Sequence, residues 1–390
     1  MKFIHSSDLH LKRDLASAEG KTRFSAFQQV CDRARGADAL VLAGDLFDSH
    51  DDLTDSALAE KVAAVLGGLA PTVVLIIPGN HEGLRASGAV EASAALRRLG
   101  NVRCVFKPPF ERVDIAGVAF YAFPFAAGAT TLDLFKGLPA PAAGELRVGV
   151  LHGTAADSGV APAAYEEDSE EEGGNLLLFD RDLASAGFAY AALGHIHKPH
   201  RWRIKGGGEG GYPGSPCAMR VKEEEERGVL EVVLEPGVAA TVKVLPLSTV
   251  RAKRAVIWVT PGEEETAIAE AEKFLSGQPR EVYAAVYFEG LADRKKLDAA
   301  KDKLEARFQA NFELPPVVKT HHLDDIGSVK GSPVARAYED LLAALKARAT
   351  EPGGPDPRLV SRAATLGWFA LAGGGKWFSQ LEKKLSEGAE

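Results

Sequence analysis

The stretch KFIHSSDLHL (residues 2–11) places Asp8 and His10 just after a short strand-like run at residues 2–5. In an extended segment, side chains two residues apart point in the same direction, so both can face one cation. An Asp-X-His pair alone is a weak indication of a metal site. Its meaning depends on the residues that come after the other strands of the chain.

Four further motifs repeat this arrangement, in which a short apolar run ends in polar residues. They are GDLFD (44–48), PGNHE (78–82), HG (152–153) and GHIH (194–197). The carboxyl ends of strands in α/β sheets gather along one edge, and ligands bind there. We therefore expect the five motifs to bring their side chains to one place.

Seven carboxylate, amide and imidazole groups in these motifs are the candidate metal ligands. They are Asp8, His10, Asp45, Asn80, His152, His195 and His197. Mixed oxygen and nitrogen ligands suit Mn, Fe or Zn better than Ca or Mg. Seven protein ligands plus waters are enough for two cations. Taken singly, Asn80 could cap a helix and His152 could be a buried structural histidine, but the five motifs together favour a metal site.

The first part of the chain alternates apolar strand-like runs with segments of helical spacing. Residues 23–35 and 54–68 have helical periodicity. Residues 111–123 alternate like a hairpin, with Gly117 at its turn. This pattern predicts an α/β or mixed sandwich, with helices covering the faces of the sheets.

Two smaller parts are expected after residue 250. Strand-like runs alternate there with helical segments, at 255–259, 263–276, 281–288, 293–310 and 316–320. Ser332 and Pro333 then form a good helix start, and EPGGPDP (351–357) interrupts the helical tail. The expected domains are 1–248, 249–327 and 328–390.

Composition limits the class of protein. The chain has 390 residues, 46% apolar and 26% charged, which fits a soluble globular protein with a sizeable core. The net charge of −8 argues against non-specific coating of nucleic acid, although a local basic groove is compatible with it. Three scattered cysteines form no disulfide framework. Apolar runs of strand length and the absence of a signal-peptide region before the first motif predict a cytoplasmic protein without a membrane span.

Basic residues follow the GHIH motif in HRWRIK (200–205). Arg201, Trp202 and Arg203 are candidate DNA contacts, with the tryptophan stacking on a base. An ordinary exposed strand explains the same residues equally well.

Three low-complexity stretches are expected to be exposed loops, at 166–174, 205–211 and 222–226. The acidic stretch 166–174 fits a solvated loop better than a device that tunes substrate access. His321 and His322 precede an acidic turn, and we expect no metal role for them.

Together, DLH, GDLFD, GNHE, HG and GHIH resemble the motifs of the calcineurin-like metallophosphoesterase superfamily. HSSDLHL (5–11), GFAYAALGHIHKPH (187–200) and YPGSP (212–216) are similar in particular to SbcD-type DNA repair nucleases. The resemblance covers about residues 1–220. It implies an α/β fold, a four-layer metallophosphoesterase β-sandwich flanked by helices, with a small αβ capping domain and a helical C-terminal tail.

Carried over by position, the resemblance implies that Asp45 bridges two divalent metal ions, with Mn as the expected metal. It divides the other six ligands into Asp8, His10 and His197 for one ion, and Asn80, His152 and His195 for the other. It places His81 near the scissile phosphate as a catalytic residue that donates a proton or stabilises the transition state. In some relatives a histidine follows the bridging aspartate by three positions; here Asp48 stands there, so His81 has no histidine partner at that position.

These features predict a metal-dependent DNA nuclease, an exonuclease and/or endonuclease, in which two metals activate water to hydrolyse phosphodiester bonds. The resemblance implies work in DNA repair with an SbcC-type coiled-coil ATPase, and a possible homodimer. The aromatic tail suggests the partner-binding segment, with Tyr338, Trp368, Phe369, Trp377 and Phe378. Packing of these helices on their own domain is an equal alternative.

Two other functions fit part of the pattern. A phosphodiesterase acting on nucleotides or other small phosphodiesters agrees slightly better with the acidic net charge. A non-catalytic subunit that organises a partner ATPase is less favoured, because every motif position holds a competent residue.

Overall fold

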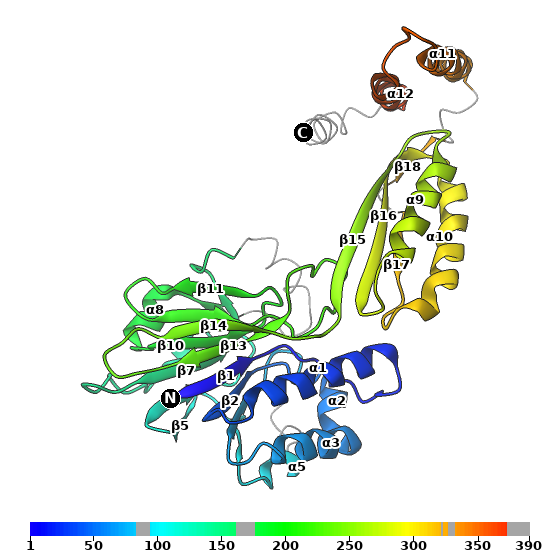
Figure 1. Ribbon diagram of the computed structural model, residues 1–390. Helices are drawn as coiled ribbons and strands as arrows, with labels where there is room; N and C mark the ends of the chain where they lie inside the picture. The colour runs from blue at the N-terminus through cyan, green and yellow to red at the C-terminus, as the bar shows by residue number, and fades with distance from the viewer. Residues whose placement is uncertain (83–93, 161–175, 321–322, 327–331, 373–390) are drawn as a thin grey trace. The chain divides into compact units, whose positions relative to one another are not determined.

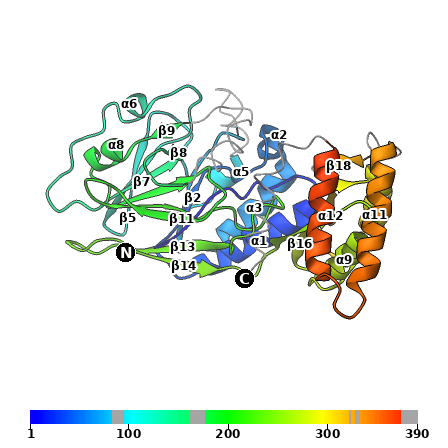
Figure 2. The ribbon, with the colours of Figure 1, turned by 90° about the horizontal axis from the view of Figure 1, so that it is seen from above.

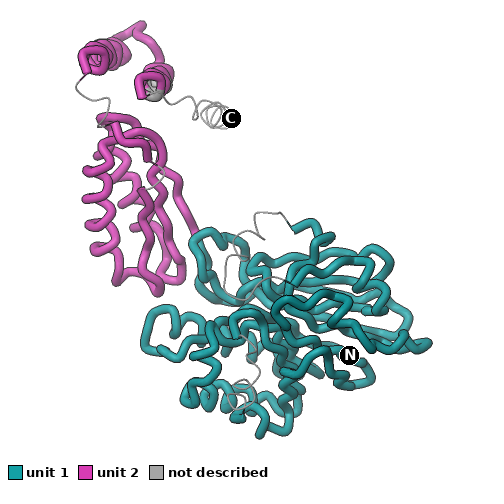
Figure 3. Tube along the Cα trace, turned by 180° about the vertical axis from the view of Figure 1, so that it is seen from behind, with its two compact units in different colours: residues 1–252 teal, residues 253–390 magenta. Residues whose placement is uncertain are grey.

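The structure, a computed structural model, describes residues 1–82, 94–160, 176–320, 323–326 and 332–372. The chain separates into two compact units, Met1–Ala252 and Lys253–Glu390 (Figure 3). Each unit has its own sheet and its own hydrophobic core. All seven candidate ligands lie in the first unit.

One sheet of the first unit combines four parallel strands with two antiparallel ones. Its order is β14 (Thr241–Pro246), β13 (Gly228–Val233), β1 (Lys2–Ser6), β2 (Ala39–Ala43), β3 (Val73–Ile77) and β4 (Val102–Cys104). β1 pairs in parallel with β2 and antiparallel with β13. β2 and β3 are continuous apolar runs because both faces of this part of the sheet are covered.

The other large sheet contains the remaining motif strands. Its order is β11 (His200–Arg203), β12 (Glu209–Tyr212), β10 (Tyr190–Gly194), β7 (Arg147–His152), β6 (Val118–Ala122) and β5 (Glu111–Ile115). β5 and β6 form the predicted hairpin, in which Gly117 has φ +80°. A two-stranded sheet of β8 (Thr154–Ala155) and β9 (Leu177–Leu178) follows the HG motif.

The prediction that 205–211 is an exposed loop is wrong at its end, where β12 begins. Gly210 and Gly211 are buried in this strand. A Cβ atom at Gly210 would lie 2.4 Å from the Trp202 ring, and one at Gly211 would lie 2.4 Å from the Tyr190 hydroxyl. These glycines therefore permit close packing of the strand rather than flexibility.

Four layers form the first unit (Figure 1). Helices α1 (Ala18–Ala34), α2 (His50–Thr54), α3 (Ser56–Gly67) and α5 (Ala94–Arg97) belong to the side of the first sheet, and α6 (Thr131–Leu134) and α8 (Asp180–Ser185) to the side of the second. Between the sheets, Phe3 packs edge-on against Phe120 and Tyr190. The predicted four-layer sandwich is confirmed.

The second unit contains a sheet covered by two helices on one side (Figure 1). Its strands are β15 (Arg251–Val259), β16 (Val282–Ala292), β17 (Val317–Lys319) and β18 (Leu323–Asp325), and its covering helices are α9 (Glu264–Ser276) and α10 (Arg294–Phe308), followed by a short 3₁₀ turn at Gln309–Asn311. The elements agree in type and order with those expected from the sequence, but β15 and β16 are longer. His321 and His322 are not among the described residues.

The helical tail forms an antiparallel pair, α11 (Pro333–Ala349) and α12 (Pro357–Leu371), which lie side by side (Figure 2). The Ser332 hydroxyl caps α11 by accepting a hydrogen bond from the Ala335 amide, as the sequence predicts. Trp368 packs edge-on against Tyr338 in a cluster that also contains Leu291 and Ile326 of the sheet region. The tail therefore shares a core with the αβ part of the second unit. Trp377 and Phe378 of the predicted partner-binding segment lie outside the described residues.

No helix in the described ranges is long and apolar enough to cross a membrane.

Trp368→Ala is expected to lower the free energy of unfolding of the second unit by about 3–5 kcal/mol, because it removes a side chain that is only 2% exposed and leaves a cavity beneath α11. Leu359→Ala in the same helix is the control, since Leu359 is 61% exposed and should change stability by less than about 0.5 kcal/mol. Denaturant unfolding followed by circular dichroism measures both. Equal effects of the two substitutions would show that the cluster does not hold the tail in place.

Candidate metal centre

The loops after β1 and β2 are joined to each other by backbone hydrogen bonds. The Asp8 amide donates to the Gly44 carbonyl at 3.1 Å, and the amides of Leu9 and His10 donate to the Asp45 carbonyl at 2.8 and 2.9 Å. The two motif loops therefore form one rigid layer at the carboxyl edge of the first sheet.

A further hydrogen bond joins this layer to the second sheet. The His195 amide, just after β10, donates to Asp8 Oδ1 at 2.9 Å. Behind it, between the sheets, His5 Nδ1 lies 3.0 Å from the Tyr190 hydroxyl. The carboxyl ends of strands from both sheets thus meet at one place, as the motif positions predicted.

Four candidate ligands have a left-handed backbone. Asp8, His10, Asp45 and His195 have φ values of 53°, 47°, 51° and 100°. Residues other than glycine rarely adopt such values, and each costs on the order of 1–3 kcal/mol unless its surroundings enforce it. The hydrogen bonds between the loops supply that constraint and turn the four side chains toward a common centre.

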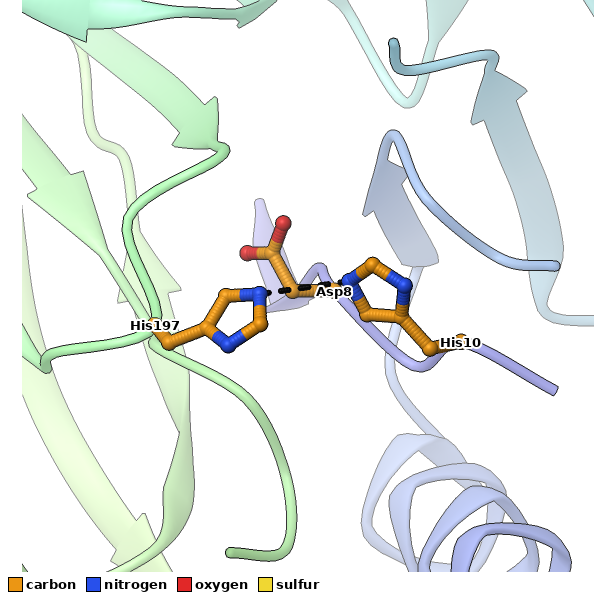
Figure 4. A group of neighbouring side chains, drawn as sticks. All are labelled: Asp8, His10 and His197. Atoms are coloured by element: carbon orange, nitrogen blue, oxygen red, sulfur yellow. Dashed lines mark hydrogen bonds between the residues drawn. The ribbon is translucent and has the colours of Figure 1, made fainter. Parts of the chain in front are cut away.

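One group of candidate ligands consists of Asp8, His10 and His197, whose potential ligand atoms all lie within 4.8 Å of one another. Figure 4 shows the two imidazole rings approaching each other from opposite sides, His10 from the loop after β1 and His197 from the loop after β10. Their Nε2 atoms are 3.2 Å apart. Asp8 is fully buried beside them.

A second group surrounds Asn80. Its Oδ1 atom lies 2.9 Å from His152 Nε2 and 3.1 Å from His195 Nδ1. Asp45 lies between the two groups, since its Oδ2 atom is 3.2 Å from His152 Nε2 and 3.8 Å from His10 Nε2. All four of these ligands are buried, with Asn80 and His195 each 4% exposed.

Burial and charge oppose each other in this centre. Burial lowers the pKa of His195 to about 3 and lowers that of His10 as well. At His152, burial also acts to lower the pKa, but the charge and hydrogen bond of Asp45 outweigh it and raise the pKa to about 9. At Asp45, burial would raise the pKa, but His152 and His10 keep it well below its ordinary value.

The donor set fits divalent cations. Carboxylate oxygens, an amide oxygen and imidazole nitrogens of buried side chains converge at 2.9–3.8 Å. The charges of Asp45 and Asp8 raise the pKa of His152, so a positive charge is favoured beside these buried carboxylates. Mixed oxygen and nitrogen ligands of this kind suit Mn, Fe or Zn. Two groups that share Asp45 could hold one ion each.

His81 lies at the edge of the centre and is half-buried. Its ring packs edge-on against His10 with centroids 4.5 Å apart. The His81 amide donates to Asp45 Oδ1 at 3.1 Å, and Nδ1 lies 3.0 Å from the Asp48 carbonyl oxygen. The main chain of Asp48 thus orients His81, although the sequence offered no histidine partner there.

Glu82 is a further buried carboxylate that the sequence reasoning did not single out. It accepts hydrogen bonds from the amides of Phe47, at 3.1 Å, and Gly79, at 2.7 Å. Burial, together with the charge of Asp45, raises its pKa to about 7. Glu82 therefore ties the GDLFD loop to the PGNHE loop, and its place within the PGNHE motif was the available signal.

Glu223 overturns the prediction that 222–226 is only an exposed loop. Its side chain is buried, and Oε1 lies 3.1 Å from Nδ1 of His197. Arg227, which is fully buried, donates to the His197 carbonyl at 2.8 Å and lies 3.6 Å from Glu223. The buried positive charge of Arg227 offsets the negative charge of Glu223. Glu223 is one of four consecutive glutamates, and the sequence alone did not indicate which of them is buried.

The candidate DNA contacts lie on β11. Arg201 and Arg203 are exposed and line a groove of about 620 Å³ with Val242 and Val244. Trp202 is half-buried, stacks on Tyr212 with centroids 5.7 Å apart, and donates from Nε1 to Asp180. These contacts hold the indole against its own domain. DNA contact by the three residues stays a prediction.

Comparison with known proteins gives the family. The family model for calcineurin-like phosphoesterases matches residues 1–233. The chain is similar to the DNA double-strand break repair protein Mre11 of Methanopyrus kandleri, with 27% identity over 248 residues that cover 58% of this chain and 51% of that protein. The protein of the same name from Saccharolobus solfataricus is 29% identical over 235 residues, covering 58% and 57%.

A subunit of the nuclease SbcCD of Bacillus subtilis is 24% identical over 372 residues, covering 80% of this chain and 93% of that subunit. The chain thus spans just over half the length of the two Mre11 proteins but nearly all of the SbcCD subunit. The resemblance inferred from the motifs is confirmed.

Gly79→Ala is expected to weaken Mn²⁺ binding by about tenfold or more. A Cβ atom at Gly79 would lie 2.1 Å from Asp45 Oδ1 and 2.7 Å from the Asp45 amide, and both are fixed in place. Relieving such overpacking costs about 1–3 kcal/mol, and about 1.4 kcal/mol corresponds to tenfold in affinity. Gly100→Ala is the matched control, because no atom lies within 4 Å of its added Cβ. Calorimetric titration of metal-free protein measures both, and unchanged affinity in Gly79→Ala would contradict a link between Gly79 packing and metal binding by Asp45.

Metal binding near pH 7.5 is expected to release about one proton. In the metal-free protein His152 is protonated below its pKa of about 9, and a coordinating imidazole must be neutral. His195, whose pKa is near 3, is already neutral and releases none. Binding heats measured in buffers of different ionisation enthalpy count the protons, and affinity should rise from pH 7 to pH 9. Heats that do not depend on the buffer would contradict this account of the His152–Asp45 pair.

Proposed function

Since the chain belongs to the calcineurin-like phosphoesterase family, we propose that it is a DNA nuclease that hydrolyses phosphodiester bonds with two divalent metal ions, Mn²⁺ being the expected metal. The observation that carries the proposal is the convergence of two ligand groups on the shared Asp45. Exonuclease and endonuclease action are both compatible with this centre.

In this proposal Asp8, His10 and His197 would hold one ion and Asn80, His152 and His195 the other, with Asp45 available to both. The grouping follows the short distances around Nε2 of His10 and around Oδ1 of Asn80. When bound, the ions would neutralise the phosphodiester and lower the pKa of a water molecule between them.

His81 is proposed to act on the leaving group or the transition state. The Asp48 carbonyl accepts from Nδ1–H and fixes the plane of the ring. One ring nitrogen of His81 lies within 4.8 Å of coordinating atoms of both His10 and Asp45. A half-buried imidazole in this position can donate a proton to the departing oxygen.

DNA as the substrate is supported by the relatives, which are named as DNA double-strand break repair proteins and as a nuclease subunit. We propose that residues 1–248 form the nuclease domain and residues 249–327 a capping domain that helps to place DNA. Arg201 and Arg203 are proposed to contact the phosphate backbone of DNA at the groove that they line. Trp202 is the least suited of the three, because its ring is already stacked.

A partner ATPase of the SbcC type is proposed to bind residues 328–390. Support comes from the relative that is named as a subunit of SbcCD and from three exposed apolar side chains on α11 and α12, Val334, Leu341 and Leu359, each more than half exposed. Packing of the same helices on Leu291 and Ile326 is compatible with such a role, because it uses a different set of side chains. A homodimer is also part of this proposal.

A phosphodiesterase acting on nucleotides or other small phosphodiesters would need the same ligand set and is the main competing function. A non-catalytic subunit would not need His81 beside the ligands. Substrate range and dependence on His81 therefore separate the three functions.

The purified protein with Mn²⁺ is expected to degrade linear DNA, and His81→Ala should lower the rate by about 10²- to 10⁴-fold without loss of bound metal, because the imidazole is proposed to transfer a proton rather than to bind an ion. Asp45→Ala is the companion variant and should lose both metal and activity. Gel analysis of DNA products and metal content by atomic absorption measure the two effects.

The same assay with bis-p-nitrophenyl phosphate tests the competing functions. Cleavage of the small ester without degradation of DNA would favour the small-substrate phosphodiesterase. Failure to cleave either substrate, with metal bound, would contradict both enzymatic functions.

A further inference from the structure

We propose that the two metal positions have unequal affinities, because Asp48 and Glu223 position the imidazoles of His10 and His197, while among the described residues no such carboxylate stands behind the histidines beside Asn80. The inference rests on the two-metal function proposed above. It assigns roles to two side chains outside the seven ligands and predicts the order in which the positions fill.

Asp48 lies behind His10. Its Oδ1 atom is 3.3 Å from His10 Nδ1, on the far side of the ring from the Nε2 atom that faces His197. Arg23 donates to both the Asp48 carboxylate and the His10 carbonyl, and Lys12 Nζ lies 3.5 Å from the same carboxylate. The aspartate is thus held in place by two cations, and it fixes both the position and the tautomer of His10.

Glu223 has the same relation to His197. Oε1 lies 3.1 Å from His197 Nδ1, while Oε2 accepts hydrogen bonds from the Ser215 hydroxyl at 3.1 Å and the Met219 amide at 2.9 Å. Arg227 neutralises the buried carboxylate and also donates a hydrogen bond to the His197 carbonyl. Every oxygen of Glu223 is therefore committed, so the His197 ring has one orientation.

The histidines beside Asn80 have weaker support. The Nδ1 atom of His152 lies 2.9 Å from the Ala43 carbonyl, a neutral acceptor. His195 directs Nδ1 toward Asn80, and its Nε2 atom is buried with no hydrogen-bond partner among the residues that the structure describes. No carboxylate orients either ring from behind in this part of the chain.

A carboxylate that accepts from the outer nitrogen of a metal-binding histidine holds the ring in its binding orientation and makes the other nitrogen a stronger donor. Removing such a partner usually costs about 10- to 100-fold in metal affinity. Two such carboxylates support the Asp8–His10–His197 position, and none from the described segments supports the other. The first ion is therefore expected at the Asp8–His10–His197 position, with the second binding only at higher free metal concentration.

Calorimetric titration of metal-stripped full-length protein with Mn²⁺ tests this order. The wild type should give two binding events whose affinities differ by about tenfold or more. Glu223→Gln and Asp48→Asn should each weaken the tight event by about 10- to 100-fold, with the weak event within about threefold of wild type.

Matched controls come from the same segments. Glu226→Gln removes the same charge from the same glutamate run at an exposed position, and Asp51→Asn does so beside Asp48, where the Asp51 side chain is 71% exposed. Both should leave the two events unchanged. If the control variants weaken Mn²⁺ binding as much as the test variants do, the effect is a general one of charge. That result would overturn the role of Asp48 and Glu223.

Ligand variants decide the order even if a test variant folds poorly. His197→Ala should abolish the tight event and keep the weak one, and His195→Ala should do the reverse. Two ions bound with equal affinity in the wild type, or loss of the tight event in His195→Ala, would overturn this inference and leave the two-metal function intact. A total of one ion bound per protein in the wild type would overturn both.

Discussion

The hydrogen bond from the His195 amide to the Asp8 carboxylate joins the two sheets at the point where the ligands gather. Each sheet supplies only part of the centre, Asp8, His10, Asp45 and Asn80 from one and His152, His195 and His197 from the other. A small displacement of one sheet against the other would separate the ligand groups. The apolar core between the sheets and the His5–Tyr190 contact within it fix that relation.

This arrangement requires unfavourable backbone conformations at the site. Four ligands are held in left-handed conformations that isolated residues avoid, and several carboxylates and imidazoles are buried together. The hydrogen bonds from the loop after β1 to Gly44 and Asp45 hold the conformations. The ions that the donor set fits would supply the positive charge that the buried carboxylates need.

Much of this could be predicted from the sequence because the signals are local. Five polar motifs that each end an apolar run indicated the strands, the edge of the sheets and the seven convergent side chains. The assignment of those side chains to two ions stays a prediction. Glu223 could not be found in this way, because nothing within the run at 222–226 distinguishes it from its neighbours. Its burial depends on Arg227 and Ser215, which meet it only in the folded chain. The internal stacking of Trp202 likewise depends on Tyr212 and Asp180 from other elements.

The central claim is that Asp45 joins two ion positions into one centre. Anomalous diffraction from a crystal soaked in Mn²⁺ tests it most directly. The account predicts two peaks about 3.5–4 Å apart, with the Asp45 carboxylate in contact with both. A single peak, or two peaks with Asp45 bound to only one, would contradict it.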